Sequence, residues 1–389
     1  MATRRNSAHH PAPAWSASQI HALRLHRHHL LDREPAGLLT LCRDVCGVQA
    51  QVMSAAYLQL WARDHSLSRG AIEEAMWKTR SLVKTSLMRQ TLHMIASDDF
   101  SLYIAALKRS RIKAALGVMA RCKVGRDEAD DLTALILETL ASGPLERTAI
   151  RAAVHPKVSK RMREWMSKVW SIMRIPVAEG LVCYGPGEGN QTTFIRTDQW
   201  LPKQATVDER KAKCELLRRY LRAYGPATLK DFAHWSGMSM VEARELAPFA
   251  QNEFAEIDGH LLLRDDVRFL EERAPDCASV HLLPHFDVYL LAHATKDHFL
   301  DPRFYKRVYR NQGWISPVLL IDGEIAGVWR FEPAGKKLGV TIEAFQPVPR
   351  RLHRQIEQKA EALAKFFGRT LDLKLGKITS AVRDRRFRL

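Results

Sequence analysis

Two glutamines stand one residue apart in the otherwise apolar stretch GVQAQVMSAAYLQLWAR, residues 47–63. The side chains of Gln49 and Gln51 are neutral amides, which are neither strong acids nor strong bases but can donate and accept hydrogen bonds. Such a pair can orient a water molecule and present partial negative charge to a cationic centre. The structural alternative is a pair of glutamines that satisfies backbone groups in a turn.

The two side chains can serve one site only if the chain between them is not helical. In a regular helix, residues two apart point about 200° away from each other, whereas in an extended segment they lie on one side. We therefore expect residues 49–51 to be non-helical and to form a bend before a helix that begins near Ser54.

The composition of the chain indicates which kind of partner it binds. The chain has 389 residues, of which 46% are hydrophobic, so it can form two or three domains with substantial cores. Its 60 Lys and Arg residues exceed its 43 Asp and Glu residues and leave a net charge of +17. An excess of this size favours a polyanionic partner, and nucleic acid is the first hypothesis.

The cysteines and histidines indicate neither a disulfide framework nor a metal site. The six cysteines are scattered without a Cys-x-x-Cys pair, which is typical of reduced, intracellular thiols. Cys42 and Cys46 are one helical turn apart but lack a second ligand pair at zinc spacing, so we expect two packing thiols. No apolar run reaches the roughly 18 residues of a membrane span. We expect no metal, no cofactor, no membrane contact, and a cytoplasmic, nucleoid-associated protein.

Helical periodicity covers most of the chain after Ser16. Helices are predicted over 16–31, 36–45, 54–64 and 68–79, and the segment 82–95 alternates as a β-ribbon does. Helices followed by a two-stranded ribbon are the layout of a winged helix, a variant of the helix-turn-helix.

This layout recurs along the chain. Helices are predicted over 131–154 and 159–180, and two short strands over 181–197; a third pass begins at Val207. Gly143-Pro144 and Gly225-Pro226 break the helices at equivalent places. Repetition of this kind favours tandem modules. From about residue 280 the pattern changes to strands, with one helix over 350–367.

The expected fold is mainly α with short β-ribbons, built from three tandem winged-helix modules and a C-terminal α+β part. The predicted divisions are a disordered basic arm (1–14), a first winged helix with the glutamine pair (15–126), a second (127–205), a third (206–278) and the C-terminal part (279–389).

Four segments resemble a known family. They are GVQAQ (47–51), LVKTSLMRQTLHMI (82–95), LLPHFDVYLLA (282–292) and VLLIDGEIAGVWR (318–330). In these segments, which span nearly the whole chain, the sequence resembles the bacterial winged-helix DNA glycosylases of the AlkZ and YcaQ type, which unhook alkylated bases and interstrand crosslinks. Gln49-Ala50-Gln51 matches the Gln-x-Gln form of the family's catalytic motif. Gln90 departs from the glycine expected in many relatives, so it could alter the first wing or narrow the cleft.

The resemblance implies a concave, DNA-embracing channel and a double-stranded DNA partner that carries alkylated bases or crosslinks. It implies hydrolysis of an N-glycosidic bond. An N7-alkylated purine already bears positive charge and leaves without protonation, so amides that position water and stabilise an oxocarbenium-like sugar suffice. Normal guanine, a poorer leaving group, is spared. No lysine lies in a recognisable nucleophile motif, so a monofunctional enzyme is expected.

The remaining candidate residues surround that pair. Four basic residues are predicted to contact DNA phosphates: Lys84, Arg89, His93 and Arg330. For His93, a buried structural imidazole is an equal alternative. Asp287 is predicted to hold a turn. A hairpin tip is a candidate wedge in the duplex: Ile321, Asp322, Gly323 and Glu324.

Two other classes of function compete with this hypothesis. A non-catalytic winged-helix transcription regulator would bind a specific sequence and be indifferent to the loss of Gln51. A metal-dependent nuclease fits less well, since no compact carboxylate or histidine cluster is evident in the sequence. Tandem modules supply the several DNA contacts that regulators obtain by dimerising, so a monomer is expected.

Overall fold

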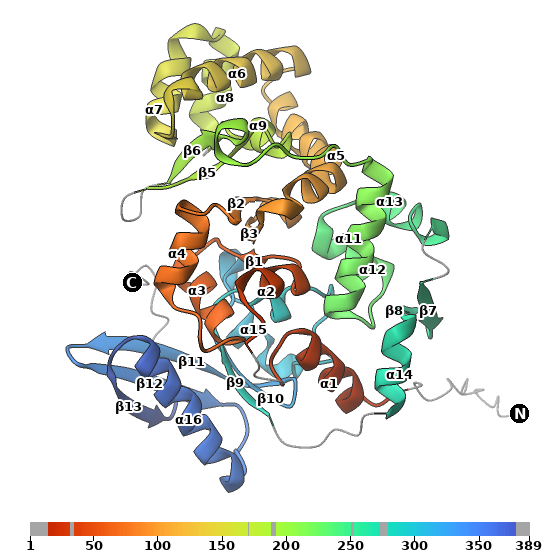
Figure 1. Ribbon diagram of the computed structural model, residues 1–389, viewed down its shortest axis with the longest axis vertical. Coiled ribbons are helices and arrows are strands. Elements are labelled where there is room, and N and C mark those ends of the chain that lie inside the picture. Colours follow the sequence, from red (N-terminus) through yellow and green to blue (C-terminus); the bar gives the residue numbers. More distant parts are fainter. Residues whose placement is uncertain are drawn as a thin grey trace, which may run out of the picture.

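The architecture was analysed in a computed structural model that describes residues 15–31, 35–169, 171–187, 192–249, 253–272 and 279–378. The predicted basic arm, residues 1–14, lies outside the described residues. The chain forms an elongated body of helices and three β-sheets (Figure 1). In the part of the chain that the structure describes, no helix is long and apolar enough to cross a membrane.

The first repeat follows α1 (Ala17–Arg27), a helix that Ser16 begins with a capping box. Its elements are α2 (Leu38–Asp44), β1 (Val48–Gln49), α3 (Met53–Trp61), α4 (Arg69–Trp77), β2 (Leu82–Ser86) and β3 (Leu92–Ala96). The short strand β1 pairs antiparallel with β3, so the segment before α3 closes the hairpin that follows α4. The predicted helices and the ribbon of this region are confirmed to within a few residues.

The second repeat has the same order of elements, with one additional helix before its hairpin. They are α6 (Arg126–Thr139), β4 (Leu145–Glu146), α7 (Arg147–Val154), α8 (Lys160–Lys168), α9 (Arg174–Ala178), β5 (Val182–Gly185) and β6 (Thr193–Arg196). Here β4 pairs with β6, as β1 pairs with β3. The single long helix predicted over 159–180 is wrong. Pro176 would clash with the carbonyl of residue 172 inside a continuous helix, whereas α9 places this proline in its first turn.

The third repeat follows the short helix α10 (Thr197–Trp200). It comprises α11 (Glu209–Tyr224), α12 (Leu229–Ser236), α13 (Met240–Arg244), β7 (Phe254–Ile257) and β8 (His260–Leu263), and α14 (Arg264–Glu272) comes after it. A β-bridge between Ala227 and Leu261 stands where β1 and β4 stand in the other repeats. Three segments of the chain therefore share a helix, a short strand or bridge, two further helices and a hairpin, in that order, and the second segment adds one helix before its hairpin.

The C-terminal part is a five-stranded sheet covered by a helix. Its elements are β9 (Val280–Leu283), α15 (Tyr305–Val308), β10 (Val318–Ile321), β11 (Glu324–Ala334), β12 (Lys337–Ala344), α16 (Arg350–Phe366) and β13 (Thr370–Leu375). The strand order is β13-β12-β11-β10-β9, and only the β12–β13 pair is parallel. The predicted change to a sheet with one long helix is confirmed.

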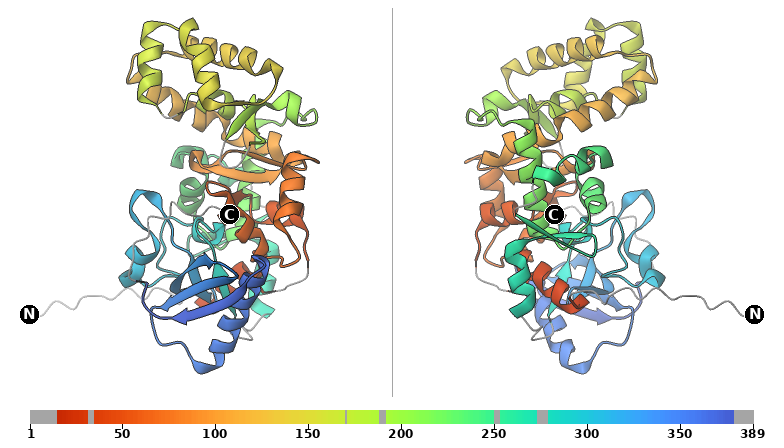
Figure 2. Two further views of the ribbon diagram at one scale, coloured as in Figure 1. Left: turned by 90° about the vertical axis from the view of Figure 1, so that its left-hand side faces the viewer. Right: turned by 90° about the vertical axis from the view of Figure 1, so that its right-hand side faces the viewer.

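The first two repeats share both a sheet and a helix. Their hairpins join in a six-stranded sheet of order β1-β3-β2-β5-β6-β4, in which Lys84 of β2 pairs with Tyr184 of β5. The long helix α5 (Phe100–Ala120) contributes Leu107 to one buried core and Ala115 to the next. Figure 2 shows the second repeat at one end of the body and the C-terminal sheet at the other.

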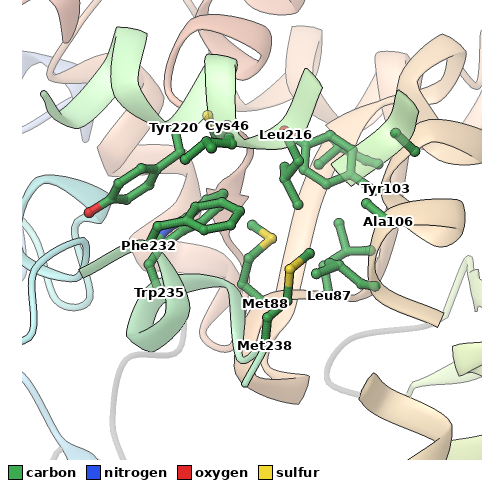
Figure 3. Packing of buried hydrophobic residues seen from close by; sticks show 14 of the residues in the cluster. Cys46, Leu87, Met88, Tyr103, Ala106, Leu216, Tyr220, Phe232, Trp235 and Met238 are labelled. Atoms are coloured by element: carbon green, nitrogen blue, oxygen red, sulfur yellow. The ribbon is translucent and has the colours of Figure 1, made fainter. Parts of the chain in front are cut away.

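A central core joins the first and third repeats. It combines Met88 with Tyr103 of α5, Tyr220 of α11 and Trp235 of α12 (Figure 3). This packing fixes α12 beside the loop between β2 and β3, where Arg89, one of the predicted DNA-contacting residues, lies.

Candidate functional site

The glutamine pair lies at the end of a short strand. Gln49 closes β1 opposite His93 of β3, and the amide of Ala50 donates to the carbonyl of Leu92 at 2.8 Å. The chain then bends, and α3 begins at Met53. The prediction that residues 49–51 are non-helical is confirmed. Because alternate residues of an extended segment share a side, this backbone allows both glutamines to face one site.

The two amides differ in burial. The side chain of Gln49 is only 5% exposed, and its Oε1 is buried without a hydrogen-bond partner in the described structure. Gln51 is exposed, and its Oε1 accepts a long hydrogen bond of 3.4 Å from the amide of Leu92. Buried polar atoms normally have partners, so the free oxygen of Gln49 is suited to a water or substrate atom. The arrangement offers one deep acceptor and one at the surface.

Consecutive buried hydrogen bonds hold the main chain at Gln49 in place. Gln59 of α3 is fully buried, and its Nε2 donates to the main-chain carbonyl of Gln49 at 3.0 Å. Arg63 donates from Nη1 to the carbonyl of Gln59 at 2.8 Å and also binds Asp287. The sequence patterns did not predict a role for Gln59 or Arg63. Gln59 lies on α3 and Arg63 lies in the turn that follows it, and this spacing of four residues shortly after Gln49 was a usable signal.

Asp287 holds a turn, as predicted. Its carboxylate accepts from the amide of Tyr289 at 3.0 Å and caps a short 3-10 helix over Val288–Leu290. The same carboxylate binds Arg63, so the turn is fixed to α3 and through it to the glutamine strand.

His93 lies inside the protein. It is 2% exposed and hydrogen-bonds through Nδ1 to the carbonyl of Thr91 at 3.0 Å, which places the ring proton on Nδ1. Burial, aided by the charges of Arg89 and Arg111, lowers the pKa of His93 to about 3. The imidazole is therefore neutral at physiological pH. Its burial favours the structural alternative over a surface contact with phosphate.

Lys84 and Arg89 occupy partly buried positions. The Nζ of Lys84 lies 5.6 Å from the ring centre of Tyr184, and burial lowers the pKa of Lys84 to about 8. Arg89 has a positive φ of 51° and donates from Nη1 to the carbonyl of Trp235 at 3.0 Å. Arg89 thus braces α12 against the first hairpin. Its neighbour Gln90 also has a positive φ, of 61°, and is exposed.

The structure does not bring Arg330 or the predicted wedge to the glutamine strand. Arg330 lies on β11 of the C-terminal sheet, with Nη1 3.6 Å from Glu332. In the turn from Ile321 to Glu324, Gly323 is buried and its carbonyl accepts from the hydroxyl of Tyr289 at 3.1 Å. This turn packs against α1, which does not suit insertion into a duplex.

A groove of about 1290 Å³ lies elsewhere, along α5 and residues 196–209. Neither Gln49 nor Gln51 lines it.

Cys42 and Cys46 are buried, and burial raises the pKa of each thiol to about 12, which is consistent with packing residues. Among the described residues, no three His, Cys, Asp or Glu side chains gather as metal ligands would.

Comparison with known proteins places this geometry in a family. A family model described as DNA glycosylase AlkZ-like matches residues 42–366, which include the glutamine pair, the first hairpin and Asp287. The chain belongs to the AlkZ-like DNA glycosylase family. The family resemblance expected from the four quoted segments is thereby confirmed.

One organism provides both a sequence relative and a solved structure similar to this AlkZ-like chain. An interstrand DNA cross-link repair glycosylase of Streptomyces sahachiroi is 31% identical over 369 residues, covering 90% of this chain and 96% of that protein. The solved structure of the Streptomyces sahachiroi DNA glycosylase AlkZ matches with a TM-score of 0.81 and 27% identity, over 93% of this chain and 99% of that one.

Proposed function

We propose that this protein is a monofunctional DNA glycosylase that hydrolyses the N-glycosidic bond of cationic N7-alkylated purines, including purines in interstrand crosslinks. The observation that carries the proposal is the buried, unpartnered amide oxygen of Gln49 at the end of a strand in an AlkZ-like DNA glycosylase. The name of the Streptomyces relative, a cross-link repair glycosylase, supports the choice of substrate.

The proposed chemistry follows from the substrate's charge. An N7-alkylated purine leaves as a neutral base, so no general acid is needed, and the remaining tasks are to orient water and to stabilise the cationic sugar. The Oε1 of Gln49 performs these tasks from within the protein, where a partial charge acts more strongly than in water. Gln51 completes the site from the exposed side. Weak groups of this kind leave normal guanine intact because its glycosidic bond requires stronger catalysis.

The proposed architecture assigns a winged-helix module to each repeat, with divisions at 15–126, 127–205, 206–278 and 279–389. Each repeat has at least three helices before a β-hairpin, and a short strand or bridge closes the hairpin; these features support the assignment. We propose that the modules form a concave channel for double-stranded DNA, that one copy acts alone, and that the enzyme works in the cytoplasm at the nucleoid. A crosslinked base cannot be flipped freely, so an open channel suits it.

The test is base release from a duplex with a single N7-methylguanine, comparing the wild type with Gln49→Ala and Gln51→Ala. All three are assayed at protein concentrations that saturate the DNA, so that a change in rate reflects chemistry. Release by the wild type with a loss of roughly 100-fold or more in the variants is expected, the size seen when one stabilising polar group is removed.

A second duplex with an interstrand crosslink tests the wider substrate class. Strand separation after incubation with the wild type, but not with Gln51→Ala, supports unhooking. Tight binding to both duplexes with no release of any base would overturn the proposal and favour a DNA-binding regulator.

A further inference from the structure

Arg111 is a buried arginine without a carboxylate partner in the described structure. Its side chain is 6% exposed, and its Nε and Nη1 atoms are buried with no hydrogen-bond partner. A guanidinium stays charged in proteins and loses hydration on burial, so an unpaired one is strongly unfavourable. We therefore expect this guanidinium to bind an anion.

The position of Arg111 points it towards the first hairpin. Tyr103, Leu107 and Arg111 are spaced four residues apart on α5 and so lie along one face of the helix. Tyr103 and Leu107 pack in the core that contains Val83 of β2 and Ile95 of β3. This face of α5 covers the sheet that carries Gln49.

Polar residues continue that face of the sheet beyond the apolar core. Thr85 shares a face with Val83 by strand alternation, and Thr85, His93 and Gln49 stand opposite one another across three strands. The hydroxyl of Thr85 is fully buried without a hydrogen-bond partner in the described residues, like the amide oxygen of Gln49. The charges of Arg89 and Arg111 both lie close enough to lower the pKa of His93.

The carboxylate that the neighbouring residue contacts is already engaged. Ser110, the neighbour of Arg111, donates to Glu242, and this carboxylate also pairs with Lys213 at 3.2 Å and caps α13. Burial lowers the pKa of Arg111 to about 10, and the phenol of Tyr184 opposes this effect. Among the residues that the structure describes, Arg111 therefore has positively charged neighbours but no carboxylate partner.

We propose that Arg111 and Thr85 bind a phosphate group beside the glutamine pair, and that during catalysis this phosphate belongs to the DNA backbone next to the excised nucleotide. The guanidinium offers parallel N–H donors that match phosphate geometry, and the threonine hydroxyl adds a third donor. A phosphate held there would fix the sugar relative to Gln49 and Gln51. The assignment of the phosphate to DNA rests on the proposed function.

The first experiment measures binding of the full chain to lesion-free duplex DNA by fluorescence anisotropy between 50 and 200 mM salt, a range chosen with the counterion relation. Arg111→Met should weaken binding roughly tenfold, the loss of one charge-assisted contact. Its plot of log K against log salt should be shallower by about 0.9, the value for one phosphate. Arg111→Lys should keep the slope but lose affinity, since it retains charge without the paired donors.

A matched control removes the same charge from the other side of the helix. Arg109 is exposed and lines the groove along α5, away from the sheet. Arg109→Met should leave base release intact, whereas Arg111→Met should reduce it even at saturating DNA.

The second experiment tests whether the bound phosphate belongs to DNA or is free inorganic phosphate. It also tests whether Arg111 has only a structural role. In phosphate-free buffer, Arg111→Met should melt at the same temperature as the wild type or higher, because it removes an unpaired buried charge. If inorganic phosphate raises the melting temperature of the wild type but not of Arg111→Met while the DNA slope is unchanged, the phosphate site stands and its assignment to DNA is overturned.

A lower melting temperature of Arg111→Met, together with unchanged DNA affinity and slope and no response to phosphate, would overturn the inference altogether. These binding measurements use undamaged DNA, so they are independent of base release. If the wild type releases no base but Arg111→Met makes the salt dependence of DNA binding shallower, only the proposed function is overturned.

Discussion

Arg63 and Asp287, which are 224 residues apart in sequence, form a bidentate ion pair with two N–O distances of 2.8 Å. Their side chains are 1% and 0% exposed. Arg63 also holds the carbonyl of Gln59, whose side chain holds the carbonyl of Gln49. The C-terminal part is therefore connected to the candidate catalytic strand by consecutive buried hydrogen bonds.

Breaking this pair should destabilise the protein strongly. Asp287→Ala leaves the guanidinium of Arg63 buried and unpaired, and the expected loss in the free energy of unfolding is about 3–5 kcal/mol. Urea denaturation followed by circular dichroism measures it. Asp130→Ala is the control, because it breaks the exposed Arg126–Asp130 pair on α6 and should cost no more than about 0.5 kcal/mol. Equal effects of the two variants would contradict this account.

Gln59 should act as a positioning residue for Gln49. Gln59→Met keeps the length of the side chain but removes the Nε2 donor, so β1 is free to shift. We expect the single-turnover rate of base release to fall by roughly 10- to 100-fold with DNA affinity unchanged, since small displacements are costly in catalysis. Gln199→Met is a matched control, because Gln199 is exposed and donates to the carbonyl of Ala141 far along the chain. A purely structural role would lower the melting temperature without lowering the rate at saturating DNA.

Buried histidines should make the fold sensitive to mild acid. Burial lowers the pKa of His93 to about 3 and that of His298 to about 2. Below about pH 6.5 these histidines are protonated in the unfolded chain but remain neutral in the folded protein. The free energy of unfolding therefore falls as the pH drops from 6.5 towards those pKa values. Each residue should contribute a loss of about 2 kcal/mol by pH 5.

Urea titrations at pH 7 and pH 5 test this dependence. His93→Gln should reduce the difference in unfolding free energy between the two pH values by about 2 kcal/mol. Gln199→Met, a change at an exposed residue that does not ionise, should leave it unaltered. An identical pH difference in His93→Gln and the wild type would count against a neutral, buried His93.

Two hairpin glycines should respond differently to the same substitution. Gly323 and Gly335 both have positive φ, so alanine costs about 1 kcal/mol at either position. A Cβ at Gly323 would also lie 2.5 Å from the Cβ of His21 in α1, whereas a Cβ at Gly335 meets nothing within 4 Å. Gly323→Ala should therefore cost about 1–3 kcal/mol more than Gly335→Ala in thermal or urea unfolding. Similar losses would indicate that the turn before β11 is free of α1.

Local signals predicted most of the secondary structure. Ser16 and Ser68 mark the starts of α1 and α4 as side-chain caps, and the alternation of residues 82–95 marks the first hairpin. The extended backbone at Gln49 was predictable because it follows from what two glutamines must do in one site. These features depend on residues within a few positions of each other.

The burial of the surrounding side chains could not be predicted in the same way. His93 and Lys84 lie on a hairpin that looks like an exposed wing in sequence, but α5 and β5 cover it. The turn at Gly323 looks like a free tip, but α1, some 300 residues earlier, packs on it. Contacts between distant segments determine whether these side chains are exposed, and the pattern of a single sequence does not predict such contacts.

Helix α5 has a consequence for how the chain can be divided. Its first half packs with residues of the first and third repeats, and its second half packs with the second repeat. A cut at the boundary between residues 126 and 127 would strip Ala115 and Met119 of their partners, and the open edge of β2 would invite aggregation. The first two repeats thus form one cooperative folding unit, and neither can be excised, transplanted or replaced without the other.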